Sequence, residues 1–280
     1  MDISLADERA FQITPQISME VARVRVDDKR ANLVAGTVGA LLSRPKPDEI
    51  KLLAAENRLE PFWLVTVGTH TVFDRNRSFS FTVAGPEVKS VTLLEHEVPA
   101  QPQAKGAPVV TLQGVEHCLE DTEATRHFDG ISGAKADFAR YLTAPSLEIL
   151  NLETFAPENV LVVPPQARAS AVVRQVMGEV VQPVQAQMLL EERVDVKAID
   201  LYFRPVYAFE YEWAAKNKKV VVEYDAVTGE ARAGGKWLGE QIRGMLTRDL
   251  LFDVTADAVG LIVPGGSIAV KLVKAVVDRK

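Results

Sequence analysis

A six-residue segment occurs twice in this chain, at positions 96 residues apart. Residues 128–133 read FDGISG and residues 224–229 read YDAVTG, so both follow the order aromatic, Asp, small, β-branched, hydroxyl, Gly. A second pair lies upstream, where residues 60–65 (EPFWLV) resemble residues 204–209 (RPVYAF) at an offset of 144. Internal repeats constrain a fold strongly, because each copy specifies one structural unit. We therefore predict a duplicated unit.

The two offsets differ by 48 residues, which indicates an insertion in the first copy. We predict an α+β fold built from two diverged repeats of a helix and an antiparallel sheet. The first repeat is expected to span residues 1–150, with a β-rich insertion at about 74–124. The second repeat follows at 151–236, and a helical segment completes the chain at 237–280.

Apolar spacing supplies the expected elements. Residues 31–42 and 167–181 have the periodicity of amphipathic helices, and each segment precedes one of the two Pro-aromatic segments. Val24 and Val26 alternate with Arg23 and Arg25, which is typical of a half-buried strand. The pattern at 237–251 also predicts a helix.

A last helix is predicted after the Pro-Gly-Gly break at residues 264–266. We expect it to dock within the chain. The alternatives are that it pairs two subunits of a homo-oligomer or that it lies on a membrane surface. Its apolar stripe and the two lysines opposite are Ile268, Leu272, Val273, Val276, Lys271 and Lys274.

The repeated six-residue segment has the chemistry of a turn. The Asp side chain can accept hydrogen bonds from backbone N–H groups two or three residues further on, and the Gly can adopt a positive φ. We therefore predict structural turns at Asp129 and Gly133 in the first copy, and at Asp225 and Gly229 in the second.

Together with the expected helix, strand and hairpin, the turn at residues 224–230 (YDAVTGE) resembles the PepSY family. Residues 128–133 resemble it more distantly. Members of that family are small α+β modules, often duplicated, in protease propeptides and in non-catalytic accessory proteins. The resemblance implies a binding or inhibitory module rather than an active site.

Composition excludes some classes of protein. The net charge of −6 argues against nucleic-acid binding, which normally requires a basic surplus. The N-terminus has no basic region followed by an apolar run, so we predict no signal peptide. A single cysteine, Cys118, fits a reducing compartment, and we predict a cytoplasmic protein.

One cluster has residue types that bind metal, namely His96, His117, Cys118 and His127. Imidazole, thiolate and carboxylate groups are zinc ligands, so a metal-dependent hydrolase that uses the three histidines is one alternative. However, the adjacent side chains of His117 and Cys118 would leave opposite faces of a strand. A nucleophilic Cys118 is also disfavoured, because nearby carboxylates raise a thiol pKa. We favour surface histidines and a buried thiol, without a metal.

Four alternating aromatic residues, Tyr207, Phe209, Tyr211 and Trp213, share one face of a predicted strand. They could form a ligand platform, but such a stripe more often forms the core under a helix. The sequence contains no nucleotide-binding glycine fingerprint and no nucleophilic serine elbow, so we predict no cofactor. We therefore expect a non-catalytic binding protein whose partner is another protein.

Overall fold

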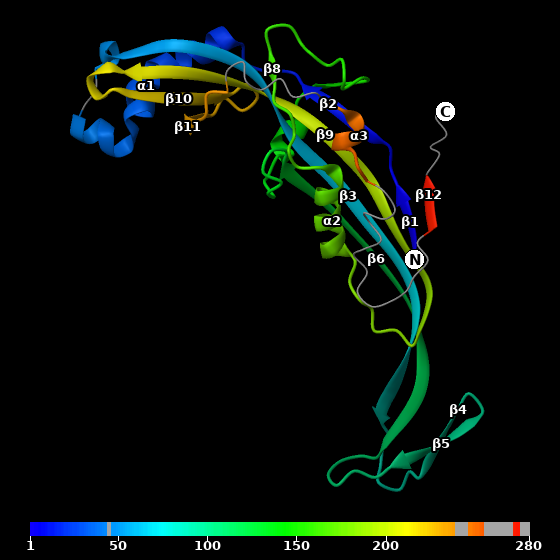
Figure 1. Ribbon diagram of the computed structural model, residues 1–280. Coiled ribbons are helices and arrows are strands. Elements are labelled where there is room, and N and C mark those ends of the chain that lie inside the picture. The colour runs from blue at the N-terminus through cyan, green and yellow to red at the C-terminus, as the bar shows by residue number, and fades with distance from the viewer. Residues whose placement is uncertain (44–45, 239–245, 255–270, 275–280) are drawn as a thin grey trace.

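The computed structural model describes residues 1–43, 46–238, 246–254 and 271–274 of the chain. Most of these residues form strands, which join into one mixed sheet that curves along its length (Figure 1). Its main path runs β11-β10-β9-β3-β6-β5-β4. The three longest strands are β3 (Ile50–Thr82), β6 (Val109–Asp129) and β9 (Met188–Trp213).

Shorter strands extend this sheet at its edges. β1 and β2 run parallel to β9, β8 runs parallel to β3, and β12 and β7 add to β1 and β2. Their bounds are β1 Asp2–Leu5, β2 Glu8–Ile13, β4 Ser90–Leu93, β5 His96–Gln101, β7 Ser146–Glu148, β8 Leu161–Val162, β10 Lys218–Asp225, β11 Ala231–Gly235 and β12 Lys271–Lys274.

The predicted fold class, a balanced α+β fold with a helical C-terminal segment, is wrong. The helices are few, namely α1 (Met19–Ser43), α2 (Ala169–Val180) and α3 (Arg248–Leu251), with 3-10 turns at Pro47–Glu49, Ala139–Thr143 and Ala214–Lys216. Both copies of the repeat contribute their strands to one sheet, because β9 of the second copy pairs from Met188 to Trp213 with β3 of the first copy. The sheet therefore dominates the architecture, and the two copies are not separate layered units.

The pairing of β3 with β9 has an approximate two-fold relationship. The sequence repeat makes Glu60 equivalent to Arg204, and these two residues are also directly paired in the antiparallel register. A pair of equivalent residues that face each other marks a local two-fold axis through the sheet. On either side of it, β3 forms a hairpin with β6 and β9 forms a hairpin with β10.

The strands and helices beside these hairpins match as well. β8 pairs with Arg58 and Leu59 of β3, and β2 pairs in the same register with the equivalent residues Tyr202 and Phe203 of β9. Each of these parallel strands leads into a helix, β2 into α1 and β8 into α2. The two copies thus share a strand, a helix and a hairpin in the same order.

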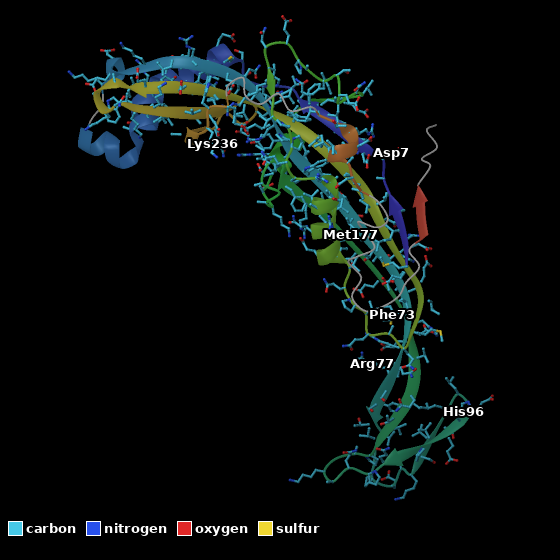
Figure 2. The ribbon with its side chains drawn as sticks, viewed as in Figure 1. Asp7, Phe73, Arg77, His96, Met177 and Lys236 are labelled. Carbon is cyan, nitrogen blue, oxygen red and sulfur yellow. The ribbon has the colours of Figure 1, made fainter. Side chains whose placement is uncertain are left out.

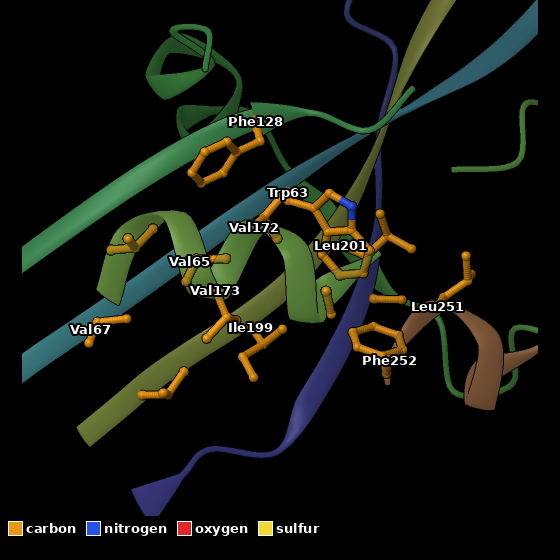
Figure 3. Packing of buried hydrophobic residues seen from close by; sticks show 14 of the residues in the cluster. Trp63, Val65, Val67, Phe128, Val172, Val173, Ile199, Leu201, Leu251 and Phe252 are labelled. Atoms are coloured by element: carbon orange, nitrogen blue, oxygen red, sulfur yellow. The ribbon is translucent and has the colours of Figure 1, made fainter. Parts of the chain in front are cut away.

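α2 lies on the concave side of the curved sheet, and α1 lies beside the strands at the end of the sheet opposite β4 and β5 (Figure 1). α2 covers a cluster that includes Trp63, Val65 and Ile199 (Figure 3). α1 covers a second cluster that includes Tyr207 and Phe209. Fully burying apolar side chains of this size is worth roughly 1.5–3 kcal/mol each, so these two clusters hold the helices on the sheet.

The chain around Val24 and Val26 is helical and belongs to α1, so the predicted strand is wrong at this position. Val26 is fully buried against the sheet while Val24 is exposed. Taken alone, two valines two residues apart are compatible with a strand. The residues that are buried are Ala22, Val26 and Val34, and their spacing of four and eight positions is that of a helix. α1 changes direction at Gly36, where φ is +71°.

The C-terminal prediction needs a second correction. Residues Lys271–Lys274 form a strand, β12, that runs parallel to β1. In the segment predicted as a helix at 237–251, the helix described is α3, of four residues, and residues 239–245 lie outside the described residues. Ile268 and Val276 also lie outside them. A short apolar segment can form a strand as readily as a helix, so the apolar pattern of this segment did not distinguish the two structures.

The two hairpins differ in one respect. β9 and β10 separate at the Trp213–Lys218 pair, and residues 214–217 close the turn. The equivalent pair in the first copy is Thr69–Thr122, but there β3 and β6 stay paired as far as Thr82 and Val109. β9 pairs with β3 only as far as Asp74. Residues 74–117 extend beyond the part of the sheet in which β9 pairs with β3, and we call them the arm (Figure 1).

Candidate functional site

The two repeated turns have the same hydrogen bonds. In the first copy the Asp129 Oδ1 accepts from the N–H groups of Ile131 and Ser132, at 3.2 and 2.7 Å. In the second copy the Asp225 Oδ1 accepts from those of Val227 and Thr228, at 2.9 and 2.8 Å. Gly133 and Gly229 have φ of +70° and +77°. The repeated segment therefore specifies one turn conformation.

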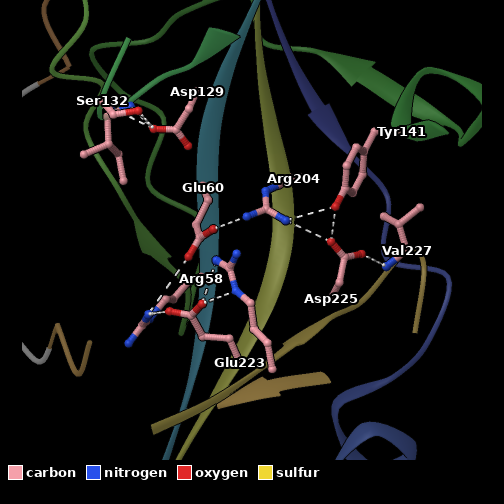
Figure 4. A network of polar contacts seen from close by, with 11 residues as sticks. Arg58, Glu60, Asp129, Ser132, Tyr141, Arg204, Glu223, Asp225 and Val227 are labelled. Carbon is pink, nitrogen blue, oxygen red and sulfur yellow. Dashed lines mark hydrogen bonds and ion pairs between the residues drawn. The ribbon is translucent and has the colours of Figure 1, made fainter. Parts of the chain in front are cut away.

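The second turn supports a charged centre at the two-fold axis (Figure 4). The Arg204 guanidinium donates to Glu60 Oε2 at 2.6 Å, to Asp225 Oδ2 at 2.9 Å and to the Tyr141 hydroxyl at 3.0 Å. The Tyr141 hydroxyl itself donates to Asp225. One arginine thus joins β3, β9, β10 and the turn at Ala139–Thr143.

A second buried arginine extends this centre along β3. Arg58 is 1% exposed, and it donates to Glu56 at 2.6 Å, to Glu223 at 3.4 Å and to the carbonyl of Lys236 at 2.7 Å. Glu223 also accepts from Arg232 at 2.9 Å. Burying charges is costly unless each is paired and hydrogen-bonded, and here every buried arginine has such partners.

Burial governs the ionisation of this centre. It raises the pKa of the Glu60 carboxyl, and the nearby Arg204 only partly offsets that effect. Burial alone would lower the pKa of Arg204, but Glu60, Tyr141 and Asp225 more than compensate, so its pKa is raised. Burial also raises the pKa of Tyr141, which keeps its hydroxyl protonated as a donor. The arrangement is that of a structural ion network, because every polar group in it already has a partner.

The candidate metal ligands lie far apart. His117 and His127 are ten positions apart on β6, which corresponds to about 33 Å along a strand. His96 lies on β5 within the arm (Figure 2). In the described part of the chain, no three His, Cys, Asp or Glu side chains converge on a possible metal position. A hydrolase centre built from these three histidines has no common site.

Each of these residues has its own surroundings. The His117 Nδ1 lies 2.7 Å from Asp74 at an exposed position. Burial lowers the pKa of His127, whose Nε2 has no hydrogen-bond partner among the described residues. Cys118 is half-buried, and its thiol lies 3.7 Å from the carbonyl of Glu116. Because His117 and Cys118 are adjacent on a strand, their side chains leave opposite faces.

The aromatic stripe lies in the core. Tyr207, Phe209, Tyr211 and Trp213 are all buried, in the cluster under α1. The Tyr207 hydroxyl donates to the carbonyl of Ile17 at 2.9 Å. The stripe is therefore not accessible to a ligand from solvent.

The arm presents the most unusual surface. Among the described residues, half of the exposed large hydrophobic side chains lie on the arm or on the strands at its base. Figure 2 places Arg77 and His96 along the arm and the buried Phe73 at its base. Exposed apolar groups gathered in this way mark interaction surfaces in many proteins. The set is Phe79, Phe81, Leu94 and Val115 on the arm, and Leu119, Met188, Leu189 and Leu190 at its base.

Sequence reasoning missed the charged centre, although one signal for it was present. Glu60 and Arg204 occupy the same position of the upstream repeat and have opposite charges. The antiparallel pairing of the two copies would have placed them face to face. Nothing in the local sequence marked Arg58 or Tyr141, whose partners lie on other elements.

Comparisons with protein-family models, with curated proteins and with solved structures found no match. Among the described ranges, no helix has both the length and the apolar character needed to cross a membrane.

Proposed function

We propose that this protein is a non-catalytic binding protein that contacts another protein through the arm. The observation that carries the proposal is the difference between the two hairpins. The second copy closes its hairpin with residues 214–217, so the repeated unit does not require a longer connection. The arm is thus an addition to that unit, and its exposed apolar groups contribute nothing to the cores under α1 and α2.

The chemistry of the arm fits a protein partner. Phe79 and Phe81 are 44% and 38% exposed on one face of the ribbon. The same face carries Arg75, which pairs with Glu116 at 2.5 Å. Aromatic and arginine side chains are enriched at protein interfaces. The arm contains five acidic and four basic residues, whereas nucleic acids and anionic membranes attract a basic surplus.

Two further observations support a binding role in the cytoplasm. The resemblance of the turn at residues 224–230 to the PepSY family favours a binding or inhibitory module over an active site. A single half-buried cysteine fits a reducing compartment.

An arm-less variant tests the proposal. In it, residues 74–117 are replaced by Ala-Ala-Lys-Asn, the sequence that closes the second hairpin at residues 214–217. The new turn joins Phe73 to Cys118. Hydrogen-bonded and non-hydrogen-bonded pairs alternate along an antiparallel ladder. The Phe73–Cys118 pair lies four positions beyond Thr69–Thr122, which is the equivalent of Trp213–Lys218. An even number of positions preserves the type of pair, so the new turn joins the same type of pair as residues 214–217 do. We expect the variant to fold, with the circular dichroism and cooperative unfolding of the full chain.

Partner contact is then measured with a photo-crosslinking amino acid at Phe79 or Phe81 in cell extract. The expected result is one discrete cross-linked product. Its yield should fall when an excess of the unlabelled full chain is added, and should not fall when the arm-less variant is added. A matched control places the cross-linker at Leu150, an exposed leucine on the body of the molecule. Equal competition by the arm-less variant, or the same product from Leu150, would exclude the arm as the contact site.

A further inference from the structure

A pocket of about 780 Å³ lies between α1 and the turn that joins β10 to β11. Arg25 and Lys29, one helical turn apart on α1, line it together with Tyr224 and Gly229. The Arg25 guanidinium donates to the Tyr224 hydroxyl at 2.9 Å. Within the described residues, neither Arg25 nor Lys29 has a carboxylate within ion-pair distance.

The other charges of the pocket are largely neutralised. Arg140 and Glu230 form a two-bond ion pair across its rim, at 2.7 and 2.9 Å. Arg204 and Arg232 are paired with carboxylates of the charged centre. Asp28 adds one negative charge to the wall. Arg25 and Lys29 are therefore the cations that remain available to a ligand.

The two-fold axis relates this pocket to a position between α2 of the second repeat and the turn at residues 128–133 of the first repeat, where the positive charges are paired. The backbone N–H groups of Gln166 and Ala167 donate to the Gly130 carbonyl, and those of Gln16 and Ile17 donate to the Ala226 carbonyl. These matching bonds set the offset between the two helices at 150 residues. Gln175 and Glu179 of α2 are consequently the equivalents of Arg25 and Lys29.

At that related position the equivalent groups on α2 are satisfied within the protein. Glu179 accepts from Arg126 at 2.9 Å and also pairs with Lys135. Gln175 donates to the Gly133 carbonyl at 3.4 Å. In the second copy the equivalents of Arg126 and Lys135 are Val222 and Ala231, which have no charge. The charge on the helix is thus reversed from Glu179 to Lys29, and no carboxylate in the described part of the chain forms an ion pair with Lys29.

The aromatic residue that begins the repeated turn also differs between the two copies, Phe128 in the first and Tyr224 in the second. Phe128 of the first copy and its equivalent Tyr224 are both buried, at 0% and 1% exposed, but the Tyr224 hydroxyl accepts a hydrogen bond from Arg25. That hydroxyl adds a hydrogen-bonding group to the pocket. Arg, Lys and Tyr side chains that converge on one position form charge-assisted hydrogen bonds with oxyanions.

We propose that this pocket binds a small ligand through an oxyanion group, phosphate or carboxylate, held between Arg25 and Lys29 and hydrogen-bonded by the Tyr224 hydroxyl. The volume of the pocket is in the range of small-molecule sites. The site lies on the body of the molecule and is independent of the arm.

The test titrates the full chain with sodium phosphate, and separately with sodium citrate, at constant ionic strength set by sodium chloride. The melting temperature is expected to rise with phosphate or citrate and to saturate. The Arg25→Gln, Lys29→Glu double variant, which copies Gln175 and Glu179 of α2, is expected to lose the rise, and Lys29→Gln alone is expected to weaken it at least tenfold. The matched control is Arg23→Gln, an exposed arginine of α1 that does not line the pocket, and it should respond like the unmodified chain.

Two results would overturn the site. One is a melting temperature that responds to phosphate and citrate no more than to chloride. The other is a saturable rise that persists in the double variant. The arm-less variant separates this proposal from the proposed function, because it should keep the full response to the oxyanion.

Discussion

Glu60 and Arg204 occupy the same position in the two copies of the repeat, and their side chains form an ion pair at 2.6 Å. Residues that face each other across a two-fold axis would be identical in two identical copies. Two identical charges there would repel each other in a poorly solvated place. Divergence to glutamate on one strand and arginine on the other turns this contact into an attraction, which the two copies can form only when they share one sheet.

The first prediction concerns the loss of this arginine. Arg204→Met leaves Asp225 buried without its cation and leaves Glu60 with Arg58 alone, at 4.0 Å, so we expect it to lower the free energy of unfolding by about 3–5 kcal/mol. The double variant Glu60→Gln, Arg204→Met should cost less than the sum of the two single changes, because the pair is coupled. Urea unfolding of the four proteins measures both quantities.

A matched control uses the exposed pair of Arg140 and Glu230. Arg140→Met removes an arginine from an ion pair with good geometry in solvent, where the expected cost is about 1 kcal/mol or less. Equal costs for Arg140→Met and Arg204→Met would show that burial of the charged centre is not what makes Arg204 important.

The second prediction follows from the raised pKa of Glu60. Between the ordinary glutamate pKa of 4.5 and the higher folded value, the folded chain holds a proton that the unfolded chain has released. The free energy of unfolding therefore falls as pH rises through this window. Glu60→Gln removes the titrating group and should make this fall shallower.

The measurement is the unfolding free energy of both proteins from about pH 4 to pH 7. Burial also raises the pKa of Asp200, so part of the fall should persist in Glu60→Gln and lessen further on adding Asp200→Asn. The lowered pKa of His127 acts in the opposite direction, because there the unfolded chain binds the additional proton. An unchanged slope in Glu60→Gln would mean that Glu60 titrates in the folded chain as it does in the unfolded chain.

The sequence predicted local features better than their assembly. The Asp and Gly positions of the two turns were readable, because turn chemistry depends on residues within five positions of each other. The antiparallel union of β3 and β9 was not readable, because it joins residues 144 positions apart and no local pattern encodes such a register. The β-rich insertion was inferred from the difference between two repeat offsets, whereas its form as a projecting ribbon depends on where β9 stops pairing.

The third prediction compares the two turn aspartates. Asp129→Ala removes the hydrogen bonds that its side chain accepts within the turn, with an expected cost of roughly 0.5–2 kcal/mol. Asp225→Ala removes the matching bonds and also a buried partner of Arg204 and Tyr141. Its cost should be clearly larger, in the range of about 3–5 kcal/mol for a broken buried pair. Thermal and urea unfolding of the two variants, side by side, measure the difference; similar losses would argue that Asp225 acts through its turn alone.

The last prediction concerns the third position of the repeated turn, which is Gly130 in the first copy and Ala226 in the second. Gly130 donates its N–H to the Pro61 carbonyl at 2.9 Å, and a Cβ at this position would lie 2.7 Å from that carbonyl oxygen. The second copy has Ala226 here, buried, with the matching bond to Pro205 at 3.1 Å. The first copy is therefore packed too tightly for a methyl group that the second accommodates.

We expect Gly130→Ala to lower the free energy of unfolding by about 1–3 kcal/mol through overpacking. The control is Gly178→Ala in α2, where an added Cβ meets nothing within 4 Å. Alanine is the better helix former by up to about 1 kcal/mol, so this variant should be at least as stable as the unmodified chain. Urea unfolding distinguishes the two directions. If Gly130→Ala instead matched the stability of Gly178→Ala, the close approach to Pro61 would relax at no cost, and the glycine would not be required by packing.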